Sequence, residues 1–188
     1  MDNKDFKTKI KEVAVYHFDQ NGYYGTTIRK IAGDVGCSLP MIYYYYKSKK
    51  ELFHEIVEKD FFAIVSRQAE RAASKNIIDL YTEFVYELNH LNSYDRKVYR
   101  LCMKVYLGFD GDDELMAVMD QWEKMIVNRH LQLVLPHLKT QADGIVIVRT
   151  LIHLLENLIE GIVVKNRYLP KDEIREELST ILAEKIIK

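Results

Sequence analysis

Hydrophobic residues recur every three or four positions along most of the 188-residue chain, which is the spacing of an amphipathic helix. Only three prolines and eight glycines interrupt this pattern, and no alternating apolar and polar stretch of strand length occurs. We therefore expect an all-α fold. After residue 48, with a turn at 108–114, the pattern predicts helices over 49–73, 76–91, 94–107, 113–135, 140–167 and 171–187.

Two shorter helices are predicted near the start of the chain. The first ends at Asn21 and Gly22, and its apolar face contains Ile10, Val13, Ala14 and Phe18. The second begins with Thr26 or Thr27 as its N-cap, and its inner face contains Ile28, Ile31, Ala32 and Val35. It stops at Gly36, where we expect a turn with a positive φ.

A third helix is predicted to begin after Ser38 as its cap. Pro40 then falls in the first turn, where its missing N–H costs little. Ser48 with Glu51 predicts a capping box before the next helix. Two short helices joined by a glycine turn are the layout of a helix-turn-helix, whose second helix enters the major groove of DNA. We therefore expect a helix-turn-helix domain over residues 1–48 and a larger helical domain over 49–188.

The third predicted helix contains four consecutive tyrosines, which cannot all share one face. Ile42 and Tyr46 are expected to face inward. The other three tyrosines combine an apolar ring with a hydroxyl, which suits contacts with a phosphate backbone. Such a helix could also belong to a core or an interface, but the capped helices and the glycine turn around it favour DNA. Its N-terminal residues, which reach base edges in a groove-bound helix, are Leu39, Pro40 and Met41.

Charge is distributed unevenly along the chain, although its formal net charge is only −1. The first 50 residues contain nine Lys or Arg against five Asp or Glu, whereas the rest contain 18 against 23. Arg29, Lys30 and Lys49 are expected to lie near phosphates, the last of them at the positive end of the fourth helix. The basic excess therefore lies in the part of the chain that is predicted to bind DNA.

The segment GYYGTTIRKIAGDVGCSLPMIYYYYKSKKELF resembles the DNA-binding region of the TetR family of bacterial transcriptional regulators. The positions that coincide with the family pattern are Gly22, Tyr23, Thr26, Thr27, Ile31, Ala32, Gly36, Ser38, Tyr43, Tyr45, Ser48, Lys49 and Leu52. The resemblance implies phosphate contacts for some of these positions and base contacts for the start of the third helix. The complete predicted DNA-contacting set is Thr27, Arg29, Ser38, Leu39, Pro40, Met41, Tyr43, Tyr44, Tyr45 and Lys49.

Pro40 and Met41 depart from the Gly-Thr pair that is common in this family, so a hydroxyl donor is absent there. Apolar contact with thymine methyl groups is a substitute. The resemblance implies a homodimer that represses transcription at a palindromic DNA operator and is released by a small, largely apolar effector. The alternative is a helical ligand-binding or interaction protein that recognises no specific operator, and the apolar tip of the third helix keeps this alternative open.

Residues 51–188 contain no catalytic signature, so we do not expect an enzyme. Six scattered histidines and two cysteines lack metal-ligand spacing, and we expect neither a metal nor a cofactor. Reduced, buried thiols in the cytoplasm are the favoured interpretation of Cys37 and Cys102. The most apolar stretch, 145–164, is interrupted by charged residues, so we expect no membrane span.

Two further sites are predicted in the second domain. Aromatic and methionine side chains suit an adaptable apolar effector pocket, although an ordinary core would explain them equally well. The candidates are Tyr81, Phe84, Tyr99, Met103, Tyr106, Trp122 and Met125.

The helix over 145–163 is apolar around most of its circumference, which indicates cover on more than one side. With the helix after Pro170 it is the candidate dimer interface, with contacts at Ile145, Val148, Ile152, Leu155, Ile159 and Ile162.

Overall fold

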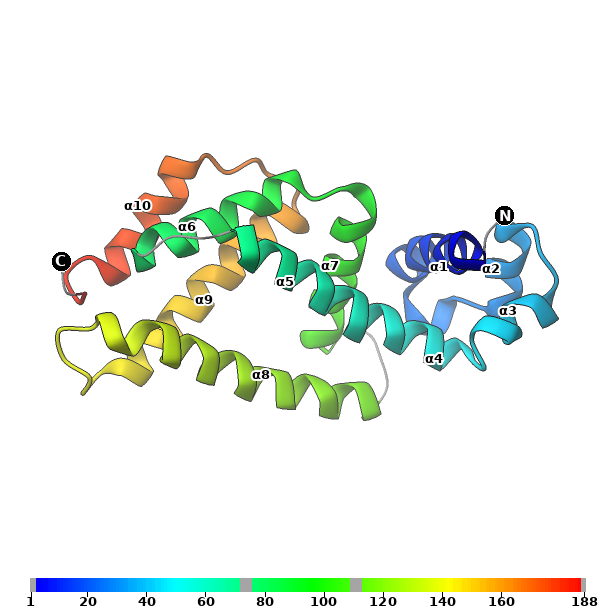
Figure 1. The fold of residues 1–188 in the computed structure, drawn as a ribbon, viewed down its shortest axis with the longest axis horizontal. Helices are drawn as coiled ribbons and strands as arrows, with labels where there is room; N and C mark the ends of the chain where they lie inside the picture. The colour runs from blue at the N-terminus through cyan, green and yellow to red at the C-terminus, as the bar shows by residue number, and fades with distance from the viewer. Residues whose placement is uncertain (1–2, 72–75, 109–112, 187–188) are drawn as a thin grey trace. The chain divides into compact units, whose positions relative to one another are not determined.

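The computed structural model describes residues 3–71, 76–108 and 113–186, and these residues form helices joined by turns (Figure 1). The only pairing of the β type among them is an isolated bridge between Leu138 and Ile186. The predicted all-α fold is therefore confirmed for the described residues. The chain divides into two compact units, residues 1–64 with 92–117 and residues 65–91 with 118–188.

Unit 1 begins with three helices whose ends follow from local sequence: α1 (Asn3–Gly25), α2 (Ile28–Val35) and α3 (Leu39–Tyr45). The predicted break in the first helix occurs at Gly22, which has φ 69°, although helical structure resumes up to Gly25. Thr27 is the N-cap of α2, and its Oγ accepts a hydrogen bond from the backbone N–H of Lys30. Gly36 ends α2 with φ 77°, as predicted.

The predicted fourth helix is interrupted by a change of hydrogen bonding. It is α4 (Lys49–His54), a π-helical segment (Glu55–Asp60) and α5 (Phe61–Arg71). Its capping box is half of the expected one, because Ser48 caps the N–H of Glu51 while the Glu51 carboxylate accepts from the N–H of Lys47. The predicted end near residue 73 and residues 109–112 of the predicted turn lie outside the described residues.

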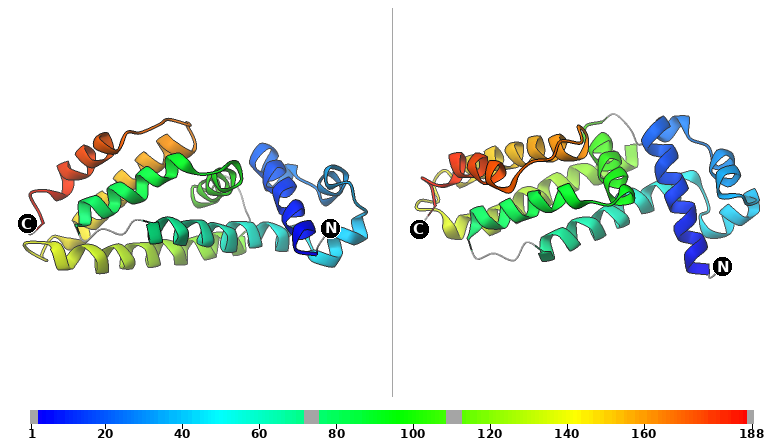
Figure 2. Two further views of the ribbon diagram at one scale, coloured as in Figure 1. Left: turned by 45° about the horizontal axis from the view of Figure 1, so that its top comes forward. Right: turned by 90° about the horizontal axis from the view of Figure 1, so that it is seen from above.

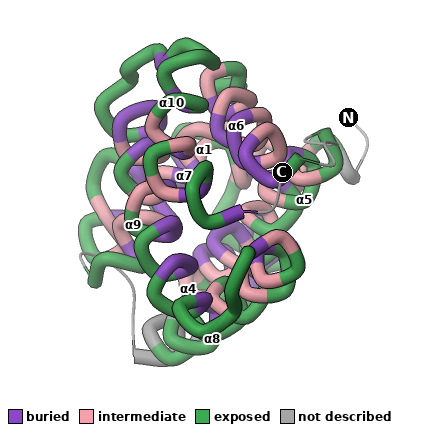
Figure 3. Tube along the Cα trace, turned by 90° about the vertical axis from the view of Figure 1, so that its left-hand side faces the viewer, coloured by how far each residue is buried: buried purple, intermediate pink, exposed green. Residues whose placement is uncertain are grey.

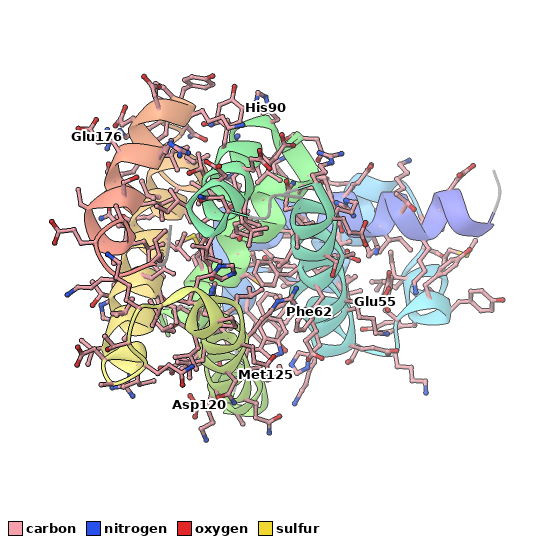
Figure 4. All side chains as sticks on the ribbon, turned by 60° about the vertical axis from the view of Figure 1, so that its left-hand side comes forward. Glu55, Phe62, His90, Asp120, Met125 and Glu176 are labelled. Atoms are coloured by element: carbon pink, nitrogen blue, oxygen red, sulfur yellow. The ribbon has the colours of Figure 1, made fainter. Side chains whose placement is uncertain are left out.

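The π-helical segment makes polar contacts with α1. Glu55 and Asp60 are five residues apart, which is one turn of i→i+5 bonding, so both carboxylates can face the same side. Lys7 and Lys11 are four apart on α1 and share one face. Their ammonium groups meet Glu55 at 2.9 Å and Asp60 at 2.7 Å. Figure 4 labels Glu55 at this position.

The remaining helix of unit 1, α7 (Ser93–Tyr106), packs against α1. Asn92 caps it by accepting from the N–H of Asp95. Cys102 is buried and donates to the carbonyl of Val57, whereas Cys37 is partly exposed. The expectation that both thiols are buried was therefore wrong for Cys37. Because α7 belongs to the same compact unit as α1, this division differs from the predicted boundary after residue 48, which stays a prediction.

Unit 2 contains α6 (Ile77–Glu87), most of α8 (Asp113–Val134), α9 (Gly144–Val163) and α10 (Lys171–Leu182). In both views of Figure 2, α10 runs beside α6 and α9, with which it makes contact. Buried residues line the inner sides of these helices and exposed residues the outer sides (Figure 3). The fully or almost fully buried apolar residues of this core include Leu151, Leu158, Ile162, Ile174, Leu178 and Leu182.

Two helices of unit 2 are shorter than predicted. The helix expected over 140–167 starts at Gly144, where a Cβ would lie 2.4 Å from Leu135 Cδ2, so a larger residue here would require the Leu135 side chain to shift. It ends at Val163. The last helix stops at Leu182, and Pro170 is its N-cap and not its first helical residue. No described helix is both long and apolar enough to span a membrane.

Candidate nucleic-acid interface

Helices α1, α2 and α3 form the predicted helix-turn-helix, which we call the reading head. The inner faces of α2 and α3 are buried as expected; they contain Ile28, Ile31, Ala32, Val35, Ile42 and Tyr46. Between the helices, the N–H groups of Gly36 and Cys37 both donate to the carbonyl of Ala32 at 3.0 Å. The Lys9 ammonium of α1 donates to the carbonyl of Val35. These contacts fix the direction in which α3 leaves the turn.

The outward side of α3 presents the residues that were predicted to approach bases. Leu39, Pro40 and Met41 form the first turn and are exposed, the methionine to 45%. Ser38 is at the N-cap position and exposed, but its hydroxyl makes no capping hydrogen bond, in contrast to the prediction. The tip of α3 is therefore an apolar surface with one hydroxyl at its edge.

The tyrosines of α3 do not behave alike. Tyr43 and Tyr44 are exposed, the second to 74%. Tyr45 is only partly exposed because its ring lies 5.5 Å from that of Phe6 in α1. Tyr46 is buried, and burial raises the pKa of its hydroxyl, with the nearby carboxylate of Glu55 adding to the shift. The structure therefore leaves two tyrosines fully available to a phosphate backbone and a third in part.

Cationic and hydroxyl groups lie beside this surface on α2. Arg29 and Lys30 are exposed, and so is Lys47, which follows α3. Thr27 is exposed and uses its oxygen as an acceptor, so its O–H can still donate to a phosphate. Groups of this kind neutralise and hydrogen-bond phosphates without reading sequence.

Lys49 lies at the start of α4 as predicted and contacts the protein backbone, while its phosphate contact stays a prediction. Its ammonium donates to the carbonyls of Tyr23 at 2.8 Å and Thr26 at 3.1 Å, and it lies 4.1 Å from the centre of the Tyr23 ring. These contacts bind the start of α4 to the connection between α1 and α2. The side chain is therefore directed to the protein backbone, and its predicted phosphate contact would require these bonds to break.

A second set of polar contacts joins α7 to α1 and to the π-helical segment. Asp19 is buried, and its carboxylate accepts hydrogen bonds from Nε and Nη2 of Arg100, at 3.0 and 2.6 Å. The Lys104 ammonium donates to the backbone carbonyl of Asp19 at 2.6 Å. The Tyr94 hydroxyl donates to Asp60, and burial together with this carboxylate raises its pKa. Sequence reasoning missed these residues because the partners are far apart in the chain and carry no local signal.

The predicted effector residues fall in both units. Tyr99, Met103 and Tyr106 belong to α7 in unit 1, and the other four belong to α6 and α8 in unit 2. Three of the seven, Tyr81, Tyr99 and Trp122, are buried, whereas Tyr106 and Met125 are exposed and the others are intermediate. Figure 4 shows Met125 on α8. The effector pocket stays a prediction.

A partly buried polar pair in unit 2 was not anticipated. The Tyr81 hydroxyl of α6 lies 2.6 Å from Nδ1 of His130 in α8. Burial, together with the nearby charge of Arg129, lowers the pKa of His130 to about 4. Burial also raises the pKa of Tyr81. A neutral imidazole accepting from a neutral phenol satisfies both polar groups at neutral pH.

Most residues of the predicted dimer interface are covered by their own chain. Val148, Ile152, Leu155 and Ile162 are at most 9% exposed, because α9 packs against α6 and α10. This burial argues against direct contact between these four and a second copy. Ile145 is 43% exposed and Ile159 partly so. The side of α9 that does face solvent includes Ile145, Val146, Arg149, Thr150, His153 and Asn157.

Sequence comparison finds relatives for part of the chain. Residues 10–56 match the family model described as "Bacterial regulatory proteins, tetR family". The chain is 40% identical over 68 residues to the "Probable HTH-type transcriptional regulator YttP" of Bacillus subtilis. That alignment covers 36% of this chain and 32% of the relative, so it spans about a third of the relative's length.

Solved structures resemble almost the whole chain. A TetR-like transcriptional regulator from Rhodococcus sp. RHA1 has a TM-score of 0.76 at 17% identity, covering 96% of this chain and 95% of that one. NalD, the secondary repressor of the MexAB-OprM multidrug efflux pump in Pseudomonas aeruginosa, has a TM-score of 0.72 at 19% identity, covering 98% of both chains. SmeT in complex with triclosan also has a TM-score of 0.72 at 19% identity, covering 98% and 93%.

Likeness at these identities shows a shared fold, while the matches to the reading head concern sequence. The match over residues 10–56 contains α2, α3 and α4 and ends within the π-helical segment. Together these comparisons show that residues 10–56 match the tetR family of bacterial regulatory proteins and that the chain as a whole shares the fold of TetR-like regulators.

Proposed function

We propose that this protein is a transcriptional regulator that binds double-stranded DNA through α3 and acts as a homodimer. The observation that carries the proposal is the outward side of α3. It presents a reading turn at residues 39–41 and exposed tyrosines behind it, with Arg29 and Lys30 on the neighbouring helix. A helix-turn-helix places such residues against base edges and phosphates.

The proposal includes release from a palindromic operator by a small effector. SmeT was solved with triclosan, and NalD is a repressor, which supports a ligand-responsive repressor on the same fold. Coupling between effector and DNA is reciprocal, so operator DNA must weaken effector binding by the same factor. Two-fold symmetry would place the two reading helices about 34–36 Å apart, one turn of DNA.

For the dimer itself we propose that a second copy meets α9 and α10. Ile145 and Val146 are exposed at the start of α9, and a buried contact would cover them. The four buried residues of the original prediction would then support the interface from behind. Sedimentation velocity of the purified protein tests this proposal; a monomer at micromolar concentration would contradict it.

Salt dependence tests the phosphate contacts of the proposed function. We expect Arg29→Ala to reduce the slope of log K against log salt by about 1, because each phosphate neutralised by a side chain contributes about 0.9 to the slope. Lys49→Met should instead weaken binding several-fold without changing the slope, because the Lys49 ammonium positions the connection between α1 and α2. Fluorescence anisotropy with a labelled duplex measures both.

The methionine in this variant keeps the aliphatic part of the lysine side chain and removes the ammonium group with its charge and its hydrogen-bond donors. We expect it to lower the free energy of unfolding by about 1–2 kcal/mol, the range for hydrogen bonds to a charged group. A slope that falls equally in both variants would show that Lys49 contacts a phosphate in the complex. A slope unchanged by Arg29→Ala would contradict the phosphate contact of Arg29.

A further inference from the structure

We propose that the first turn of α3 reads thymine methyl groups, so that the half-site bound by each copy contains thymines beneath Leu39, Pro40 and Met41. This inference rests on the proposed function and names the feature of DNA that the reading turn recognises. It assigns base recognition to three side chains that cannot donate hydrogen bonds to bases.

The chemistry of the three side chains carries the inference. None of them has an N–H or O–H donor, and the methionine thioether is only a weak acceptor. Guanine offers acceptors in the major groove, cytosine offers an amino donor, and adenine offers one of each. Each would lose hydrogen bonds to water on meeting an apolar turn and would gain none. The thymine methyl is the one major-groove group that gains from this contact.

These three side chains are exposed to solvent and do not pack into the core. Leu39 and Met41 are 39% and 45% exposed, and Pro40 is exposed as well. Ile42, the next residue, is fully buried, which fixes the rotation of α3 and turns the preceding residues outward.

Charge around the apolar tip argues for DNA as the occupant. Arg29 and Lys30 on α2 and Lys47 after α3 are all exposed, while Tyr43 and Tyr44 supply hydroxyl donors. An apolar protein surface would leave these cations without partners, whereas a DNA duplex presents phosphates on both sides of its methyl groups. Thr27, Ser38 and Tyr43 remain available for polar contacts at neighbouring bases.

Replacing thymine by uracil tests the inference, because it removes the 5-methyl group and keeps every hydrogen-bonding atom. The duplex is one recovered from random sequence by the full-length protein, with single thymines in the half-site exchanged for uracil. We expect binding to weaken about fourfold for each methyl group under the tip, the value of one buried carbon at about 0.8 kcal/mol. Exchange of thymines outside the half-sites should have no effect.

Variants of Met41 separate the methyl contact from a change in DNA shape. Met41→Leu keeps an apolar side chain and should keep the sensitivity to uracil. Met41→Gln has a similar length but adds a donor and an acceptor, and it should abolish the sensitivity at one base pair. Met41 is exposed, so neither change threatens folding.

Unchanged affinity for every uracil-containing duplex would overturn the inference and leave the proposed function intact. Equal binding of selected and scrambled duplexes by the unaltered protein would overturn the proposed function itself. Loss of sensitivity in Met41→Gln but not in Met41→Leu would support the methyl contact.

Discussion

Replacing Asp19 by alanine is expected to lower the free energy of unfolding by about 3 kcal/mol, because removal of one partner leaves a buried charge uncompensated. The Asp19 side chain is 2% exposed and Arg100 is 21% exposed, so water can replace little of the lost interaction. Two nitrogens of Arg100 and the ammonium of Lys104 surround this carboxylate. Urea unfolding followed by circular dichroism measures the change.

A matched control is available on the surface. Lys165 and Glu160 form a pair 3.1 Å apart in which both side chains are well exposed, so Glu160→Ala should change the free energy of unfolding by less than about 1 kcal/mol. The double variant Asp19→Ala with Arg100→Ala should be less destabilised than the two single changes added together. Equal effects at Asp19 and Glu160 would show that the contact between α1 and α7 contributes no special stability.

Acid is expected to destabilise the protein through His130. The pKa of this residue is about 4 when folded, below the ordinary value of about 6.5 in the unfolded chain. Below pH 6.5 the unfolded chain therefore binds a proton that the folded protein does not, and stability falls as the pH falls. The loss of stability caused by His130 is absent above about pH 6.5 and grows as the pH falls. It is complete below about pH 4, where it amounts to about 3 kcal/mol at most.

The pH dependence of unfolding in His130→Gln isolates this contribution. The glutamine carbonyl can still accept from the Tyr81 hydroxyl, but it does not titrate. Between pH 7 and pH 4 we expect His130→Gln to lose less stability than the unaltered protein. The control His153→Gln changes an exposed position of α9 and should behave like the unaltered protein. Identical pH profiles for all three proteins would contradict the assignment to His130.

The reading head was predictable because its signals are local. Caps at Thr27 and Ser48, a positive φ at Gly36 and the inner faces of α2 and α3 all follow from neighbouring residues. The apolar tip of α3 was likewise evident, since exposure of residues 39–41 follows from burial of Ile42 and the helical period.

Features that depend on residues far apart in the chain could not be predicted from local sequence. Nothing near Lys49 indicates that its ammonium turns to carbonyls more than twenty positions away. The π-helical segment places Glu55 and Asp60 against lysines of α1, and much of the apolar face of α9 packs against α6 and α10. A hydrophobic pattern shows that a face must be buried, but it does not show which partner buries it.

Selection from a pool of random duplexes tests the central claim most directly, namely that this chain reads DNA sequence through α3. Full-length protein is allowed to bind the pool at moderate salt, and the bound duplexes are sequenced over several rounds. We predict an inverted repeat whose half-sites are centred about 10 base pairs apart and contain thymines, and a different half-site for Met41→Gln. A bound pool with the same composition as the starting pool would contradict this account and favour a helical ligand-binding or interaction protein.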